Sequence, residues 1–215
     1  MISTTVEFYF DPVSPYAWLA MEQVARVTAA GGSINCRPIL LAALLNANGT
    51  KGPAEVPAKR AYVFRDVMRQ AKRLNLSFRG PPNHPFNPLA ALRAILAVEV
   101  QAQRLILARR ILSAVWSDGI DIADLNSLSR VMTQSGFHAD ALLAAAASDE
   151  VKQRLRSCTQ EAIDAGVFGV PTFGVQGDLF WGADRVDAVI WALNGGAVDE
   201  DLYERVLSRP TAASR

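Results

Sequence analysis

The stretch TVEFYFDPVSPYAWLAMEQVARVTAAGG, residues 5–32, decides the fold class of this chain of 215 residues. Residues 5–10 are rich in β-branched and aromatic side chains, which predicts a strand. From Tyr16 to Ala30 apolar residues recur at helical spacing, and Gly31-Gly32 is a typical helix end. Residues 33–40 predict a second strand. A strand, a helix and a further strand in this order indicate the beginning of an α/β fold.

The middle of the chain has a helical pattern. Residues 59–74 place apolar side chains on one face, and residues 89–165 show no strand-like alternation. Asn87 followed by Pro88 is typical of a helix start. Three glycines are expected to divide the long helical stretch: Gly119, Gly136 and Gly166.

Strand character returns near the end of the chain. Residues 169–175 and 179–181 are β-rich runs on either side of Gln176-Gly177-Asp178, which predicts a hairpin. Residues 184–193 then predict an amphipathic helix. Strands at both ends therefore enclose a helical insertion of about a hundred residues.

The charge balance excludes some classes of partner. Lys and Arg number 22 against 21 Asp and Glu, so the net charge is +1. A nearly neutral chain offers no general attraction to nucleic acid or to an anionic membrane. We expect neither as a partner.

Cysteine and histidine are too few and too scattered for a disulfide framework or a zinc site. Cys36 and Cys158 form no CxxC motif, and His84 and His138 have no second ligand at metal spacing. The first residues lack the pattern of a signal peptide, and no apolar run approaches the roughly 20 residues that span a bilayer. We therefore expect a cytoplasmic protein without a dedicated metal.

Ser14 is the first candidate for chemistry, because it lies after a strand and directly before Pro15 at a helix start. One interpretation is an ordinary helix cap. The other is a hydroxyl that donates to an anion or a thiolate at the positive end of the helix. No Gly-x-Ser-x-Gly motif surrounds it, which argues against a hydrolase nucleophile.

Two later segments are ambiguous when taken singly. Val170 precedes Pro171, and an X-Pro bond is cis in only about 5–6% of cases. Asp184 could cap the last predicted helix, with Asp187 completing a weak capping box.

Taken together, these motifs resemble one family. Residues 8–17 (FYFDPVSPYA), 168–172 (FGVPT) and 182–185 (GADR) match, in this order, the 2-hydroxychromene-2-carboxylate isomerases, which are relatives of the kappa-class glutathione transferases. Further matches extend the resemblance over the chain: Arg37-Pro38, Pro57-Ala58-Lys59 and Trp116.

The resemblance implies a thioredoxin-like α/β fold with an inserted all-helical domain. Residues 1–47 and 155–215 would form the thioredoxin-like domain, and residues 48–154 the helical insertion. Related enzymes are homodimers, so the resemblance implies a homodimer here as well.

The resemblance also implies glutathione as cofactor. Ser14 stands where thiol oxidoreductases of this fold carry the first cysteine of CxxC, and Ala17 stands at the second, so dithiol exchange cannot occur there. The sulfur would come from glutathione, whose γ-glutamyl end would lie against residues 181–185. The glutathione-binding residues implied in this way are Ser14, Lys59, Val170, Trp181, Gly182, Ala183, Asp184 and Arg185.

The implied reaction is the isomerisation of a 2-hydroxychromene-2-carboxylate to an open benzylidene-pyruvate in aromatic catabolism, with glutathione regenerated. Ser14 would be the catalytic residue, and Asn87 could contact the small aromatic carboxylate or simply cap a helix. Lys59 could bind an anionic group or lie on a solvated basic face. Relatives acting on naphthalene-derived substrates carry a lysine in the loop after the second strand, where this chain has the uncharged residues 42–48.

Two alternatives remain open. A kappa-type glutathione transferase or peroxidase would share the site but consume glutathione on small electrophiles. A non-catalytic binding protein would keep the fold without turnover.

Overall fold

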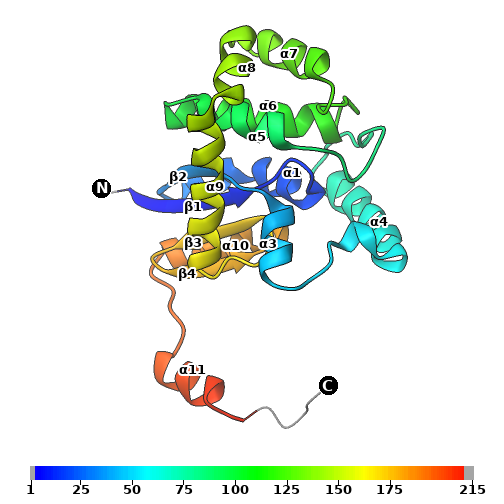
Figure 1. The fold of residues 1–215 in the computed structure, drawn as a ribbon. Helices are drawn as coiled ribbons and strands as arrows, with labels where there is room; N and C mark the ends of the chain where they lie inside the picture. Colours follow the sequence, from blue (N-terminus) through cyan, green and yellow to red (C-terminus); the bar gives the residue numbers. More distant parts are fainter. Residues whose placement is uncertain (1–2, 211–215) are drawn as a thin grey trace.

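The structure, a computed structural model, describes residues 3–210, and one mixed four-stranded sheet lies at its centre (Figure 1). The strands are β1 (Thr4–Phe10), β2 (Gly32–Pro38), β3 (Thr172–Val175) and β4 (Asp178–Trp181). Their order in the sheet is β2-β1-β3-β4, with β1 parallel to β2 and antiparallel to β3. The first and last predicted strand regions therefore pair directly, which confirms the α/β class.

Helices account for most of the remaining chain. The longer ones that surround the sheet are α3 (Leu41–Ala47), α4 (Pro57–Arg73), α5 (Leu89–Ala97), α6 (Gln101–Trp116), α7 (Leu125–Gln134), α8 (Ala139–Ala147), α9 (Asp149–Asp164), α10 (Val186–Leu193) and α11 (Glu200–Leu207). Two short 3₁₀ helices are η1 (Pro53–Glu55) and η2 (Ala183–Arg185). In Figure 1, α5 to α8 lie together on one side of the sheet, and α11 stands apart from the rest.

The helix predicted over residues 16–30 is two helices, α1 (Pro15–Met21) and α2 (Val24–Ala29). The side chain of Gln23, at the break, donates to the carbonyl oxygens of Leu19 and Ala183 at 3.1 and 3.2 Å. The bond to Ala183, 160 positions away in the sequence, ties the break to η2. Since no glycine or proline stands there, the local sequence gives no signal for the break.

Two further predictions need correction. Residues 42–48, expected as a loop, lie largely in α3, because alanine and leucine dominate this run and favour a helix. The stretch 89–165 is divided at Gly119, Gly136 and Gly166, as predicted, but also between α5 and α6 and again at Ser148, which caps α9. The division into domains implied by the resemblance stays a prediction, and its boundary at residue 154/155 lies within α9.

The hairpin prediction is confirmed. β3 and β4 pair in antiparallel fashion across Gln176 and Gly177, whose φ angles of 51° and 99° are both positive. Two positive φ angles are typical of the tight turns that match the twist of a hairpin.

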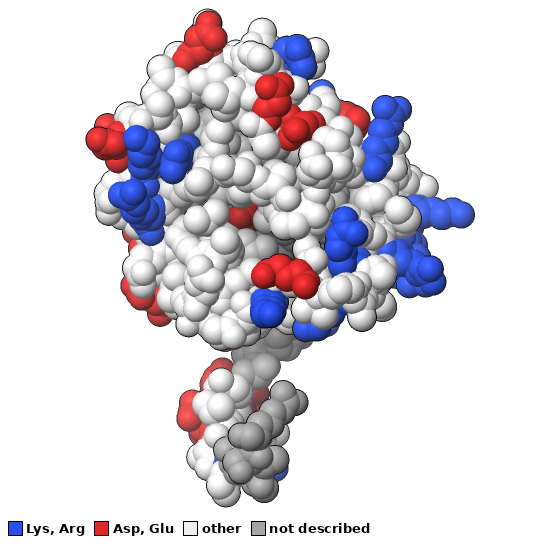
Figure 2. All heavy atoms as spheres, turned by 45° about the vertical axis from the view of Figure 1, so that its right-hand side comes forward, with Lys and Arg blue, Asp and Glu red and all other residues white. Residues whose placement is uncertain are grey.

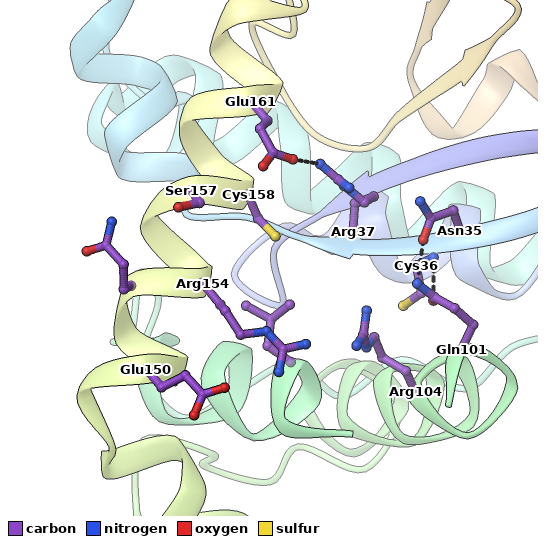
Figure 3. Close-up of a pocket in the computed structure, with 12 residues that line it drawn as sticks. Asn35, Cys36, Arg37, Gln101, Arg104, Glu150, Arg154, Ser157, Cys158 and Glu161 are labelled. Carbon is purple, nitrogen blue, oxygen red and sulfur yellow. Dashed lines mark hydrogen bonds and ion pairs between the residues drawn. The ribbon is translucent and has the colours of Figure 1, made fainter. Parts of the chain in front are cut away.

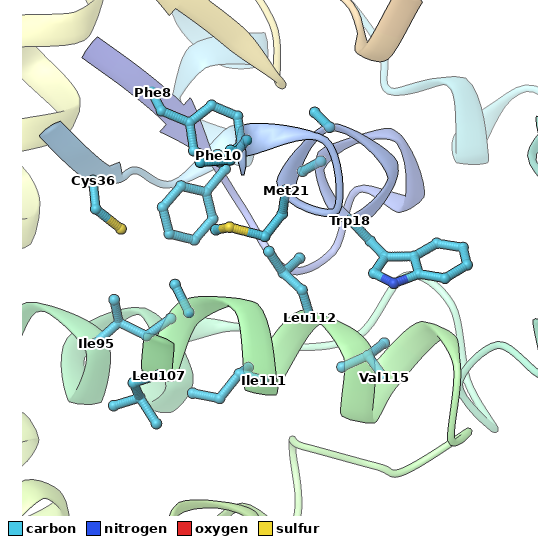
Figure 4. Close-up of a cluster of buried hydrophobic side chains, with 14 of the residues drawn as sticks. Phe8, Phe10, Trp18, Met21, Cys36, Ile95, Leu107, Ile111, Leu112 and Val115 are labelled. Carbon is cyan, nitrogen blue, oxygen red and sulfur yellow. The ribbon is translucent and has the colours of Figure 1, made fainter. Parts of the chain in front are cut away.

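One hydrophobic core joins the sheet to the inserted helices. Phe8 stacks between Phe10 and Phe173 with ring centroids 5.4 and 4.7 Å away. Figure 4 shows the side chains of α6 facing those of β1 and α1 across this core. Fully buried aromatic side chains each contribute about 1.5–3 kcal/mol by leaving water, so the helical insertion and the sheet stabilise each other.

No helix within residues 3–210 is long and apolar enough to cross a membrane.

Candidate active site

Ser14 lies at the turn between β1 and α1 and caps the helix. Its Oγ accepts a hydrogen bond from the backbone N–H of Ala17 at 3.3 Å, and Pro15 occupies the first helical position. The same hydroxyl donates to the carbonyl oxygen of Val170 at 3.3 Å. With 6% of its surface exposed, Ser14 forms part of the floor of the site. The cap interpretation is therefore correct as far as it goes, but the hydroxyl has a second, distant partner.

Val170 brings the second predicted motif to Ser14. The peptide bond between Val170 and Pro171 is cis. The backbone N–H of Val170 donates no hydrogen bond to any residue between 3 and 210, although the residue is buried. A backbone N–H without a protein partner is suited to pairing with an extended ligand backbone.

The segment 181–185 continues from this edge. The N–H of Gly182 donates to the carbonyl oxygen of Pro171 at 2.9 Å, which fixes the start of η2 beside the cis bond. Trp181 is 54% exposed and its ring meets that of Phe168 at a centroid distance of 5.0 Å. Ala183 is buried. The structure thus brings Ser14, Val170 and this segment into one region.

Asp184 does not cap a helix, contrary to one of the two interpretations of the sequence. Arg185 is the residue that precedes α10, no side chain caps that helix, and Asp187 pairs instead with Arg26. The Asp184 carboxylate lies 3.1 Å from the Arg185 guanidinium and is mostly exposed. It is therefore available at the rim of the site.

The side chains of Trp116 and His84 hold in place the turn that precedes Ser14. The sequence did not assign either residue a role in the site. The indole N–H of Trp116 donates to the carbonyl oxygen of Pro12 at 3.0 Å. His84 Nε2 lies 2.9 Å from the carbonyl oxygen of Val13, so Nε2 carries the proton of this contact. Burial lowers the pKa of His84, which favours the neutral ring. Both side chains fix the residues that precede Ser14.

Asp11 fixes the other end of the same turn. Its two carboxylate oxygens accept hydrogen bonds from the N–H groups of Val13 and Leu41, each at 2.9 Å. Burial raises the pKa of Asp11 to about 7, although both hydrogen bonds act to lower it. An aspartate directly after a strand and before Pro12 is a turn signal, so its role could have been found from the sequence.

Tyr16 connects α1 to α4. Its hydroxyl donates to a carboxylate oxygen of Asp66 at 2.9 Å, and burial together with this acceptor raises the pKa of Tyr16. The negative charge of Asp184 adds to this effect, so the rim carboxylate lies within electrostatic reach of α1. Lys59 is exposed two turns before Asp66 on α4 and forms no ion pair within residues 3–210.

Asn87 acts as a helix cap. Its side-chain oxygen accepts from the N–H of Leu89 at 3.0 Å at the start of α5. No hydrogen bond or ion pair within the described residues links Asn87 or Lys59 to Ser14. The roles that the sequence suggested for these two residues therefore stay predictions.

The face that carries α4 and the carboxyl end of β1 is hollowed (Figure 2). Mainly uncharged side chains line the hollow, and charged side chains lie around it. The chemistry offered at Ser14 consists of a hydroxyl and free backbone groups. The thiols lie elsewhere, at Cys36 in β2 and Cys158 in α9. This arrangement can bind and orient a ligand that brings its own reactive group.

Comparison with known proteins places the chain among thioredoxin-like enzymes. The family described as a DSBA-like thioredoxin domain matches residues 5–194. The 2-hydroxychromene-2-carboxylate isomerase of Sphingobium xenophagum is 30% identical over 191 residues, which cover 86% of this chain and 96% of that protein. Human glutathione S-transferase kappa 1 is 27% identical over 198 residues, or 85% of this chain and 88% of its own.

A solved structure gives the same result. The structure of a 2-hydroxychromene-2-carboxylate isomerase superposes with a TM-score of 0.82 at 27% identity. The match covers 95% of this chain and all of the other.

Proposed function

This chain belongs to the DSBA-like thioredoxin family, in the group that contains the 2-hydroxychromene-2-carboxylate isomerases and the kappa glutathione transferases, and we propose that it is a glutathione-dependent isomerase of 2-hydroxychromene-2-carboxylate-type compounds. The observation that carries the proposal is the hydrogen bond from Ser14 to Val170 in a site without cysteine. We further propose that it serves aromatic catabolism in the cytoplasm as a homodimer.

The residues present fit glutathione. When bound, glutathione supplies a thiol that ionises to a nucleophilic thiolate. The Ser14 hydroxyl would donate to that sulfur, and its present bond to Val170 is long enough, at 3.3 Å, to be exchanged at little cost. The unpaired N–H of Val170 is the matching donor for a carbonyl of the glutathione peptide.

The exposed residues around the Ser14 site would bind the charged groups of glutathione and of the substrate. Asp184 is the acidic group suited to the α-ammonium of the γ-glutamyl residue, with Trp181 to Arg185 forming the surrounding segment. Lys59, which has no ion pair within the described residues, is the cation suited to a carboxylate of glutathione. We retain Asn87 as a candidate contact for the aromatic substrate, through the amide nitrogen that its capping role leaves free.

The catalytic role of this chain's own groups is to hold a charge in a place with little water. Ser14 lies in a buried floor, where one hydroxyl donor to an anion has a larger effect than it would in water. Neutral His84 and the indole of Trp116 keep the turn in position, so Ser14 needs little rearrangement to donate.

Calorimetric titration of reduced glutathione at pH 7 tests the binding step. We expect saturable binding to the wild type and at least about tenfold weaker binding to Ser14→Ala, because a charge-assisted hydrogen bond contributes about 1.5–3 kcal/mol. Ser148→Ala is the matched control, because Ser148 also caps a helix through its hydroxyl but lies in α9. Lack of wild-type binding at millimolar glutathione would favour the non-catalytic alternative.

A kappa-type transferase is the second candidate, and one observation favours it. α3, which follows β2, carries no charged side chain in its sequence LAALLNA, whereas relatives acting on naphthalene-derived substrates have a lysine in this region. Turnover of the chromene carboxylate with total thiol measured throughout separates the two. An isomerase leaves the thiol concentration unchanged, and a transferase consumes one thiol for each electrophile converted.

A further inference from the structure

A cavity of about 520 Å³ lies between the edge strand β2 and the helices α6 and α9 (Figure 3). It is separate from the Ser14 site, with which it shares no residue. Most of the residues that line it are polar or charged, among them Arg37, Arg104, Glu150, Arg154, Ser157 and Glu161. A volume of this size suits a small organic molecule.

Arg104 is the unusual member of this wall. It is 7% exposed, and its Nε donates to the carbonyl oxygen of Val98 at 2.8 Å. No carboxylate within residues 3–210 lies within 4 Å of its guanidinium group. Buried charges are normally paired, because leaving water without a counter-charge is costly.

Nearby carboxylates pair with neighbouring arginines and not with Arg104. Arg154 pairs with Glu99 at 2.7 Å, and Arg37 pairs with Glu161. Glu150 also lines the cavity but forms no ion pair with a described cation. Burial lowers the pKa of Arg104, and the positive charge of Arg154 adds to that effect, so the two guanidinium groups act on each other.

Figure 3 shows the side chains of Arg104 and Arg154 reaching into the same space, from α6 and α9 respectively. Two guanidinium groups that reach into one space can bind a carboxylate or phosphate together. Glu99, which pairs with Arg154, is not part of the cavity wall. The bond to Val98 uses Nε of Arg104, so the terminal nitrogens remain for such a ligand.

We propose that this cavity is a second ligand site, which binds a small organic anion through a carboxylate or phosphate group held between Arg104 and Arg154. Ser157, on the same face of α9, offers a hydroxyl to the body of the ligand. Cys158 lies in the wall, half-buried, so a bound ligand covers its thiol. The site does not depend on the function proposed for Ser14.

Titration calorimetry with inorganic phosphate and with succinate, at constant ionic strength set with NaCl, tests the site and separates the two sources of anion. We expect saturable binding of at least one probe to the wild type, at least about fivefold weaker in Arg154→Gln, since a charged hydrogen bond is lost. Arg156→Gln is the matched control, because Arg156 lies on the same helix with its side chain exposed and outside the cavity wall.

Labelling of Cys158 by a maleimide gives a second readout. The bound probe is expected to slow labelling of the wild type at least twofold and to leave Arg154→Gln unaffected, with Cys158→Ser identifying the labelled residue. Arg104→Lys keeps a charge in the core and should weaken binding with the fold intact. The proposal is wrong if neither probe binds above the NaCl reference, or if Arg154→Gln and Arg156→Gln bind alike.

Glutathione affinity serves as the internal reference. The Arg154→Gln variant is expected to bind glutathione as the wild type does, because the Ser14 site contains no residue of the cavity wall. Loss of both activities together would indicate unfolding, and circular dichroism of the variant distinguishes that outcome.

Discussion

The two proposed sites, at Ser14 and at the arginine cavity, would bind a ligand by opposite means. At Ser14 the binding groups are a neutral hydroxyl and backbone atoms, and buried side chains hold them from behind. In the cavity the binding groups are long charged side chains: Arg154 is held by an ion pair near the surface, and the buried Arg104 by one hydrogen bond to the Val98 carbonyl oxygen. This difference indicates that the geometry of the Ser14 site depends on the packed core. Binding at the cavity depends instead on side-chain charge and should tolerate small changes in the structure around it.

Removing the Trp116 side chain should have the largest effect on stability and on the Ser14 site. Trp116→Ala deletes a fully buried indole and its bond to Pro12, so we expect a loss of about 3–5 kcal/mol in the free energy of unfolding and loss of glutathione binding. Trp181→Ala is the control, since that indole is 54% exposed. Urea unfolding measures both, and equal losses would contradict the dependence on the core.

Asp11 should give the turn a pH-dependent stability. Its pKa of about 7 in the folded protein exceeds the value of about 3.9 for an unfolded chain. Its contribution is therefore complete below about pH 4 and is lost as the pH rises through 7. Between pH 5 and 8 we expect the wild type to lose about 2–3 kcal/mol that Asp11→Asn does not lose.

Unfolding curves at several pH values measure this difference, with Asp124→Asn as control. Asp124 caps α7 at the surface, and its bonds to Ser127 lower its pKa. The stability contributed by Asp124 is therefore lost only as the pH falls below about 4. A pH slope that persists in Asp11→Asn would assign it to other groups.

Gly182 tests the edge of the Ser14 site. Its φ angle of 124° disfavours other residues, and an added Cβ would strike the Asp184 carboxylate. Gly182→Ala should cost about 1–2 kcal/mol and weaken glutathione binding. Gly195→Ala is strained in a similar way, with φ of 87°, but its Cβ would meet no atom within 4 Å. If both variants bind glutathione equally, the segment 181–185 is not part of the binding site.

Breaking an ion pair at the cavity should have the smallest effect on stability. Glu161 is more than half exposed in its pair with Arg37, so Glu161→Gln should change the free energy of unfolding by at most about 1 kcal/mol. Succinate affinity should rise, because the wall loses a negative charge and Arg37 keeps only its longer pair with Glu7, at 3.6 Å. A loss of stability as large as that of Trp116→Ala would remove the contrast between the two sites.

The same contrast explains what the sequence could predict. Several features have local signals, and the structure confirms them: the strand before Ser14, the proline after it, the hairpin turn at Gln176-Gly177 and the glycines that end helices. The resemblance added the thioredoxin-like fold, and the structure places Val170 beside Ser14. The break at Gln23 has no glycine or proline to signal it, and its long-range bond goes to a carbonyl oxygen 160 positions away.

The roles of Trp116 and His84 were beyond the sequence for the same reason. Their bonds reach the backbone of Pro12 and Val13 from more than seventy positions away, and no spacing rule announces such a contact. The arginine cavity is harder still. Arg104 and Arg154 occupy ordinary helical positions, and only the packing of α6 against α9 and β2 gives them a shared space.

The hydrogen bond between Ser14 and Val170 joins residues 156 positions apart, which has a consequence for how the protein is made. During synthesis β1 and α1 leave the ribosome long before Val170 does. The Ser14 site therefore cannot form while only the amino-terminal half of the chain has been made. Contacts of such separation are expected to close late, because closing a long loop costs chain entropy and this cost is offset only once the intervening helices have packed. Glutathione that binds the closed site would select the completely folded chain and stabilise it by mass action. Binding at Ser14 would therefore report that both ends of the chain have reached the same sheet.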